Sequence, residues 1–251
     1  MDMQMTTLDN KLALVSGAAG VLGEVVVRGL IGRGCRVLMA DIQLAPLEAL
    51  ADELGPNAIP IQLDVSDDQA IANTAKHIRE AHGDVDILVN NAGILSNNKA
   101  VETSPEEWRR LMSINLDGAF FLAREWLGGM KAKGWGRIVN ICSLASKTGG
   151  LTAGTAYTTS KGGMTALTFS LARESARFGV TVNGVSPAYI KTPMVTEQLS
   201  QEQQQKLLSD IPVGRFCEGE EVAHVVDFLV SPLSGFITGE IVDINGGLHL
   251  D

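Results

Sequence analysis

The sequence predicts an α/β fold: a doubly wound, seven-stranded and mainly parallel sheet with helices on both faces, in one domain that spans residues 1–251. Short runs of β-branched residues alternate with longer segments of helical period, which is typical of repeated βαβ units. The runs are mostly continuous in apolar residues, as in parallel strands that helices cover on both faces. With 45% hydrophobic and 20% charged residues, the chain can bury a large core, so a disordered protein is excluded.

The strands and helix starts can be placed from the N-terminus onward. We expect strands at Lys11–Ser16, Arg36–Asp41, Ile59–Asp64, Asp86–Asn90, Arg137–Cys142, Thr181–Val185 and Glu240–Ile244. Helices fill the intervals between these strands. Ser66 with Gln69 has the spacing of a capping box at a helix start. Ser104 with Glu107 has the same spacing, and Pro105 suits the first position of that helix.

Two features distinguish the chain after the sixth predicted strand. The segment 187–216 is the least regular, because a polar, glutamine-rich stretch of helical propensity lies between segments that contain proline. We interpret this segment as a lid over a pocket, whose apolar residues are Tyr189, Met194, Val195 and Leu199. After it, apolar residues recur at the spacing of one core-facing helix stripe: Val222, Val225, Val226, Leu229 and Val230.

Charge and composition exclude several classes of function. The chain has 20 Lys and Arg against 29 Asp and Glu, and no basic run could neutralise a phosphate backbone, so nucleic acid is not an expected partner. No apolar stretch reaches the length of about 18 residues that spans a membrane, and we expect no membrane partner and a cytoplasmic location. Cys35, Cys142 and Cys217 are odd in number and widely spaced, which excludes a disulfide framework. The four histidines are dispersed, so no metal site is expected.

A glycine-rich turn follows the first predicted strand directly. Gly17, Gly20 and Gly23 lead into a helix, so the backbone can approach a pyrophosphate while the helix N-terminus offers unpaired N–H groups. Asp41 ends the second strand, where a carboxylate can accept both hydroxyls of an adenosine ribose. This carboxylate repels a 2′-phosphate, and no Lys or Arg follows within residues 42–44. The pattern therefore predicts a Rossmann-type site that prefers NAD.

Further motifs follow in a fixed order along the chain. They are Asp64-Val65, Asn90-Asn91-Ala92-Gly93, Asn115, Ser143, and the Tyr-x-x-x-Lys pair of Tyr157 and Lys161. With these motifs the sequence resembles the short-chain dehydrogenase/reductase family over nearly its whole length. The resemblance implies NAD as cofactor, bound by Gly17, Gly20, Leu22, Gly23, Asp41, Asp64, Val65, Asn91, Ala92, Gly93, Tyr157, Lys161, Pro187, Ile190 and Thr192.

The catalytic roles centre on the tyrosine and the lysine. Tyr157 and Lys161 are four residues apart and share one helix face, so the ammonium can favour the phenolate, and Tyr157 is the expected acid/base. The resemblance implies that Ser143 hydrogen-bonds the substrate oxygen and that Asn115 anchors a water molecule that passes the proton to solvent. Ser143 lies 14 residues before Tyr157, one more than is typical of the family, so Ser146 competes with it for the serine role.

Three functions remain open. The leading hypothesis is an NAD-dependent oxidoreductase that interconverts a secondary alcohol, for example a polyol, a sugar or a hydroxy acid, and its ketone. Polar Asn97, Asn98 and Lys147 favour it, because they lie in loops after cofactor-side strand ends. The alternative is a 3-oxoacyl thioester (acyl-carrier-protein) reductase. Asp41 disfavours the NADPH that such reductases commonly use, and Phe178 stands where they often place an arginine for the acidic carrier. The third is a non-catalytic nucleotide-sensing protein, against which the intact Ser, Tyr and Lys set argues.

Two long predicted helices, Ser104–Lys131 and Thr155–Phe178, carry more apolar surface than one side of a sheet needs. The resemblance implies a homotetramer that packs through these helices, with Trp108, Phe120 and Phe169 as candidate contacts.

Overall fold

The fold is described by a computed structural model, which covers residues 7–192 and 200–250. A seven-stranded sheet in the order β3-β2-β1-β4-β5-β6-β7 forms its centre, and every neighbouring pair is parallel. The strands are β1 (Leu12–Ser16), β2 (Arg36–Asp41), β3 (Ala58–Gln62), β4 (Ile87–Asn90), β5 (Gly136–Ile141), β6 (Val180–Pro187) and β7 (Ile241–Ile244). The predicted doubly wound fold is confirmed, and the strand order reverses between β1 and β4, where open α/β sheets bind ligands.

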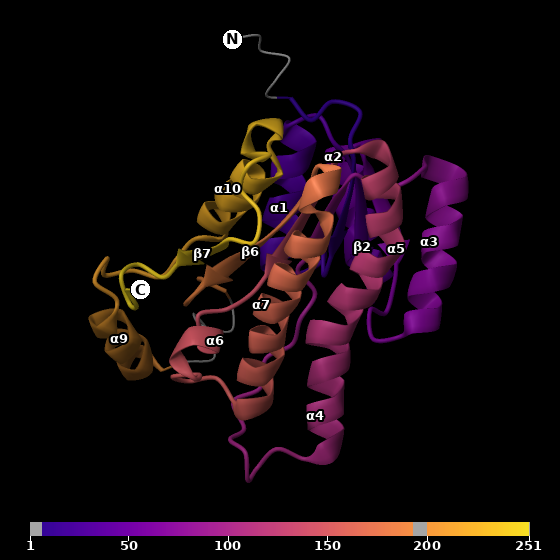
Figure 1. The fold of residues 1–251 in the computed structure, drawn as a ribbon. Coiled ribbons are helices and arrows are strands. Elements are labelled where there is room, and N and C mark those ends of the chain that lie inside the picture. Colours follow the sequence, from indigo (N-terminus) through magenta and orange to yellow (C-terminus); the bar gives the residue numbers. More distant parts are fainter. Residues whose placement is uncertain (1–6, 193–199, 251) are drawn as a thin grey trace.

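Helices cover both faces of the sheet (Figure 1). They are α1 (Val21–Gly32), α2 (Leu44–Leu54), α3 (Asp68–His82), α4 (Pro105–Met112), α5 (Gly118–Lys133), α6 (Ala145–Thr148), α7 (Thr155–Ser175), α9 (Gln201–Asp210) and α10 (Gly219–Val230). Helices α1, α2 and α10 pack on one face, and α3, α5 and α7 pack on the other. Single turns of 3-10 helix follow α7 and α10, at Ala176–Phe178 and Pro232–Ser234.

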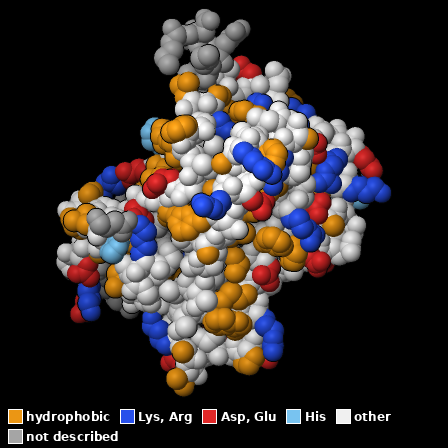
Figure 2. Space-filling view, viewed as in Figure 1, with side chains coloured by type: hydrophobic (Ala, Val, Ile, Leu, Met, Phe, Trp, Pro, Cys, Tyr) orange, Lys and Arg blue, Asp and Glu red, His pale blue; other side chains and the backbone are white. Residues whose placement is uncertain are grey.

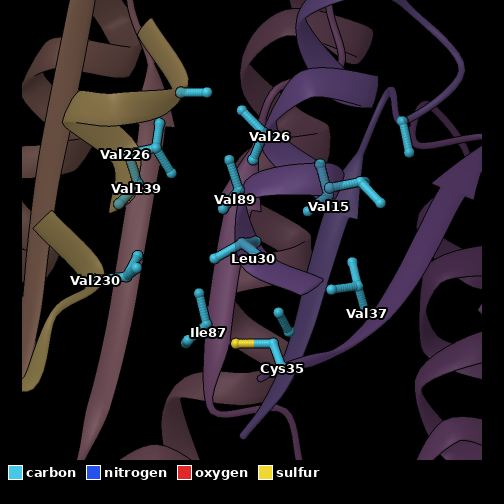
Figure 3. Packing of buried hydrophobic residues seen from close by; sticks show 14 of the residues in the cluster. Val15, Val26, Leu30, Cys35, Val37, Ile87, Val89, Val139, Val226 and Val230 are labelled. Atoms are coloured by element: carbon cyan, nitrogen blue, oxygen red, sulfur yellow. The ribbon is translucent and has the colours of Figure 1, made fainter. Parts of the chain in front are cut away.

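Alternate residues of each strand enter the two cores, as the period of a strand requires. In β1, Ala13 and Val15 lie in the core under α1 and α10, while Leu12 and Leu14 lie in the core under α3, α5 and α7. Figure 3 shows the first core, in which side chains of α1 and α10 point toward those of the strands. The predicted α10 stripe is confirmed, since Val222, Val226, Leu229 and Val230 are fully buried and Val225 packs against them.

The predicted capping box at Ser66 is wrong. Helix α3 is capped by Asp67, whose carboxylate accepts a hydrogen bond from Ala70 N. Ser66 lies one residue before this cap, and its hydroxyl donates to Asp64, 2.7 Å away. At the next helix, Ser104 does cap α4 by accepting from Glu107 N, but the Glu107 carboxylate binds elsewhere.

The expected long helix Ser104–Lys131 is interrupted. A π-helical turn at Ser113–Asp117 separates α4 from α5, so one extra residue is accommodated where Asn115 lies. The boundaries of β2 match the prediction, and those of the other strands differ from it by one or two residues; for example, β3 ends at Gln62, and Asp64 lies in the loop beyond it. No helix within the described ranges is both long and apolar enough to cross a membrane.

Candidate active site

Two adjoining cavities open at the carboxyl ends of the strands and share Leu22, Asn91, Gly93 and Ile94 in their walls. We call them the glycine-side cavity, which contains the glycine turn and Asp41, and the tyrosine-side cavity, which contains Tyr157. Their volumes are about 460 Å³ and about 360 Å³. Each residue predicted to bind the cofactor lines one cavity or both, so the structure brings the whole predicted set together.

The glycine turn is built for a close approach of backbone to a ligand. Gly17 has φ +66°, and a Cβ there would lie 2.8 Å from Ala92 Cα. At Gly23 a Cβ would lie 2.1 Å from the Gly17 carbonyl oxygen. Gly20, the N-cap of α1, faces the cavity and no side chain caps the helix there. The first-turn N–H groups of α1 therefore face a space that suits a pyrophosphate, which is the fit that a dinucleotide requires.

Ser16 ties the turn to the neighbouring strand. Its hydroxyl oxygen accepts hydrogen bonds from the N–H groups of Asn91 and Ala92, each 3.1 Å long. The Asn91 side-chain amide donates to the carbonyls of Ser16 and Gly17, at 3.0 Å each. These bonds fix the spacing between the ends of β1 and β4, where the two cavities meet.

The two acidic residues of the glycine-side cavity are held by backbone N–H groups. Asp41 accepts from Ala19 N and Gln43 N, at 3.1 Å each, one on each carboxylate oxygen. Asp64 accepts from Ser66 N at 2.9 Å. Each carboxylate is therefore fixed in orientation at the wall of the cavity before any ligand binds.

Arg110 of α4 also lines the glycine-side cavity, and the sequence analysis missed it. It is the only basic side chain in that wall among the residues that the structure describes. Its neighbour Arg109 lies 3.9 Å from Glu106 and does not reach the cavity. No local sequence pattern places Arg110 there, because the face of α4 that meets the cavity is set by the fold.

Ser143, Tyr157 and Lys161 meet in the wall of the tyrosine-side cavity. Lys161 is 4% exposed, its ammonium donates to the Ile141 carbonyl at 2.6 Å, and it lies 5.9 Å from the centre of the Tyr157 ring. Helix α7 begins at Thr155, so both residues lie in its first two turns. A phenol, a hydroxyl and an ammonium that converge on one cavity can deliver a proton to a carbonyl oxygen and stabilise the charge that forms.

The structure separates the two candidate serines. Ser143 lines the tyrosine-side cavity, and its hydroxyl oxygen accepts from Ala145 N at 3.2 Å, which leaves its proton available. The Ser146 hydroxyl donates to the Ser143 carbonyl at 2.8 Å, and Ser146 is absent from the described wall of the cavity.

We therefore expect Ser143→Ala to lower kcat by about 10²-fold, the size of effect seen when one hydrogen-bond donor to a reacting oxygen is removed. Ser146→Ala is the matched control and should keep kcat within about twofold, because its hydroxyl bonds only backbone. Steady-state kinetics of both variants decide the point. A larger loss in Ser146→Ala than in Ser143→Ala would reverse the assignment.

Asn115 lies in the π-helical turn, is fully buried, and faces neither cavity among the described wall residues. Its side chain accepts from Ile94 N at 2.8 Å and donates to Ile94 O and Ser160 Oγ, both at 3.0 Å. The amide thereby joins the loop after β4 to α7. Its role toward a water molecule stays a prediction.

The remaining wall of the tyrosine-side cavity is mainly apolar. Its apolar residues come from at least five separate segments and include Leu95, Leu144, Leu151, Tyr189 and Leu248, of which only Tyr189 was predicted from the sequence. Lys161 is the only charged side chain in the described wall. No single stretch of sequence reveals this wall, because its residues gather only in the fold.

The polar residues expected to bind substrate are used within the protein. Asn98 donates to Glu107 at 2.9 Å, and Lys147 forms an ion pair with Asp243 at 2.6 Å. Asn97 lines neither cavity in the described part of the chain. In the expected lid, Pro187, Ile190 and Thr192 line the tyrosine-side cavity. Three of its apolar residues lie outside the described residues: Met194, Val195 and Leu199.

Cys35, Cys142 and Cys217 are free thiols, and Cys217 is only half-buried. Burial raises the pKa of the Cys217 thiol to about 11, so it is protonated at neutral pH. Across residues 7–192 and 200–250, no three His, Cys, Asp or Glu side chains come together to hold a metal ion.

Residues 17–249 match a family model described as Enoyl-(Acyl carrier protein) reductase. A 3-oxoacyl-[acyl-carrier-protein] reductase of Vibrio cholerae serotype O1 is 39% identical over 244 residues, which is 97% of this chain and 99% of the relative. The reductase of the same name from Escherichia coli is 37% identical over 243 residues, or 96% of this chain and 98% of the relative.

Two solved structures are similar over almost the whole chain. One is a putative gluconate dehydrogenase from Agrobacterium tumefaciens, with a TM-score of 0.92 and 31% identity, covering 97% of this chain and 98% of that one. The other is named gox2181, with a TM-score of 0.93 and 32% identity, covering 99% of each chain. The family model and the curated relatives are named as enoyl and 3-oxoacyl carrier-protein reductases, and one of the solved structures is named as a putative gluconate dehydrogenase.

Proposed function

The chain belongs to the short-chain dehydrogenase/reductase family, and we propose that it is an NAD(H)-dependent enzyme that interconverts a 3-oxoacyl thioester and the 3-hydroxyacyl thioester. Membership makes it an oxidoreductase. The names of the 36–39% identical relatives favour the thioester, which the sequence analysis ranked second. The family's nicotinamide cofactor fits the glycine turn and the two oriented carboxylates described above.

The observation that carries this proposal is the wall of the tyrosine-side cavity. A gluconate-like acid brings a carboxylate and several hydroxyls, which need cationic or polar partners when they leave water. The described wall offers Lys161 as its only charge, and that ammonium already donates to Ile141 O. A short neutral acyl chain can instead pack against Leu95, Leu151 and Leu248.

Each of the three polar groups has a role in this reaction. Bound NADH supplies the hydride. Tyr157 donates its phenolic proton to the 3-oxo oxygen as the carbonyl is reduced, and Ser143 donates a hydrogen bond to the same oxygen. Lys161 places a positive charge beside the phenolate that remains after the proton has left. Pro187, Ile190 and Thr192 border the space for the nicotinamide.

The assembly that we propose is a homotetramer in the cytoplasm. Trp108, Phe120 and Phe169 are 39%, 43% and 49% exposed, and Figure 2 shows hydrophobic side chains on the face formed by α4, α5 and α7. Large apolar groups that stay exposed on neighbouring helices favour an interface between copies.

A substrate panel tests the reaction. We expect acetoacetyl-CoA with NADH to give a kcat/KM about tenfold or more above every polyol, sugar acid and simple secondary alcohol with NAD⁺, because one or two charged or hydroxyl groups left unpaired in an apolar cavity cost at least that factor. Higher efficiency with gluconate or a polyol would return the assignment to the alcohol dehydrogenase. Tight NADH binding without turnover of any substrate would instead support the nucleotide-sensing protein.

A further inference from the structure

The segment 149–155, which is the loop between α6 and α7 together with the first residue of α7, forms one side of the tyrosine-side cavity. Leu151, Thr152 and Ala153 lie in the cavity wall, and α7 begins at Thr155. Gly149 and Gly150 both have left-handed backbone, with φ of +76° and +81°. The loop is therefore irregular, and its position depends on contacts with other segments.

Those contacts come from the segment 96–99, which follows the fourth strand. The Lys99 ammonium donates to the carbonyls of Gly150 and Ala153, at 3.2 and 2.7 Å. Two backbone bonds run in parallel, from Gly154 N to Ser96 O at 2.7 Å and from Thr155 N to Asn98 O at 3.1 Å. The segments are so close that a Cβ on Gly154 would lie 2.4 Å from Asn98 O.

Glu107 holds the segment 96–99 in turn. Its carboxylate accepts from the Ser96 hydroxyl and from the Asn98 amide, the latter at 2.9 Å. These two hydrogen bonds keep the pKa of the Glu107 carboxyl below its ordinary value, so the group is ionised at neutral pH. Glu107 lies in the first turn of α4, which Ser104 caps, so the network is anchored on a regular helix.

Neither Lys99 nor Glu107 lines a cavity among the described residues, and the roles assigned above leave both unexplained. We propose that Lys99 and Glu107 are positioning residues that hold the 149–155 loop against α4 and thereby set the fit of the substrate in the tyrosine-side cavity. This inference rests on the proposed function for the identity of the site, but its contacts do not depend on which carbonyl compound is reduced.

Loss of these contacts should affect the binding of the substrate and not the binding of the cofactor. Without the ammonium, the carbonyls of Gly150 and Ala153 lose the donor that holds them, and the wall of the cavity can move. None of the residues assigned to the cofactor, in either cavity, belongs to this loop. Substrate binding should therefore weaken while binding of NADH is unchanged.

Lys99→Met is the first test, because methionine keeps an apolar stem and removes the charge. We expect KM for the best carbonyl substrate to rise about tenfold, with kcat within about threefold, since two charge-assisted hydrogen bonds at a partly exposed site are lost. The NADH dissociation constant, measured by fluorescence titration, should stay within about twofold. Lys99→Arg should recover most of the KM, because a guanidinium can donate to two carbonyls. Lys76→Met on the exposed side of α3 is the matched control and should change nothing.

Amide hydrogen exchange gives a readout that needs no substrate. In Lys99→Met and in Glu107→Gln, the peptide that covers residues 149–155 should exchange about tenfold faster, while the peptide over residues 17–23 keeps its wild-type rate. The double variant should exchange little faster than either single one, because both residues act through the same contacts.

Unchanged exchange of residues 149–155 in both variants would overturn the proposal, as would a loss of NADH affinity equal to the loss of substrate affinity. A failure of acetoacetyl-CoA as substrate would count against the proposed function alone, because the exchange result stands without it.

Discussion

Tyr157→Phe should lower kcat by roughly 10²–10⁴, the usual contribution of a positioned acid or base, while NADH binds as tightly as to the wild type. The phenol lies in the cavity wall with Ser143, and phenylalanine keeps its ring and its packing. Only the proton that is delivered to the carbonyl oxygen is removed. Single-turnover kinetics with NADH, together with a fluorescence titration, separate the chemical step from cofactor binding.

The chain offers a matched control, because it has two tyrosines and both lie in this cavity. The Tyr189 hydroxyl is 3.4 Å from the Thr152 hydroxyl and has no ammonium beside it among the described contacts. Tyr189→Phe should keep kcat within about threefold. If Tyr157→Phe kept more than about a tenth of the turnover, another residue would be the acid.

Replacement of Lys161 should affect both the chemical step and the binding of the cofactor. Its ammonium lies between the phenol and the Ile141 carbonyl and is buried, so Lys161→Ala removes the charge beside the phenol and leaves a buried carbonyl without a donor. We expect lower kcat and weaker cofactor binding together, in contrast to the selective effect at Tyr157.

The second large effect concerns the cofactor. The wild type should use NAD(H) with a kcat/KM about tenfold or more above that with NADP(H), since a like-charge contact in a partly desolvated site costs several kcal/mol. Backbone N–H groups of Ala19 and Gln43 hold both oxygens of the Asp41 carboxylate, so it cannot turn away from a 2′-phosphate without losing them. Equal or better use of NADPH by the wild type would contradict this.

Two amide substitutions sharpen the test. Asp41→Asn keeps the shape of the side chain and removes the charge, so the preference for NAD(H) over NADP(H) should narrow by about tenfold, with Arg110 of the same cavity as a cation for the phosphate. Asp64→Asn is the control. Asp64 also lines the cavity, but its replacement should change the kcat/KM for NAD(H) and for NADP(H) by the same factor. The ratio of the two kcat/KM values in each variant is the measurement.

Local signals predicted most of the fold. Apolar runs located all seven strands, because helices cover both faces of the sheet; the five inner strands are buried, and β3 and β7 at the edges are mostly half-buried. The failures came from competition between neighbours. Ser66 and Asp67 are adjacent and both are residue types that cap helices; Asp67 caps α3, and no pattern of capping residues distinguishes these outcomes. The π-helical turn at Asn115 depends on contacts with Ile94 and Ser160, which are remote in sequence.

The residues of the site also fall into those that local motifs predict and those that only the fold brings together. The glycine turn, Asp41 and the Tyr-x-x-x-Lys pair are local, since each motif contains its own spacing. The apolar wall and Arg110 depend on which helix faces meet, and this information is spread over the chain. The sequence makes Lys147 a candidate for substrate binding, but its ammonium forms an ion pair with Asp243, which is 96 residues away along the chain.

The π-helical turn at Ser113–Asp117 also limits how the chain length can vary in evolution. Deleting one residue there would restore an ordinary α-helix and turn α4 by about 100° relative to α5. Glu107 would leave Ser96, and Arg110 would leave the glycine-side cavity, although neither residue had been replaced. Insertions and deletions should therefore not be tolerated in this turn, and both cavities depend on the number of residues between Ser104 and Gly118 as much as on their identity.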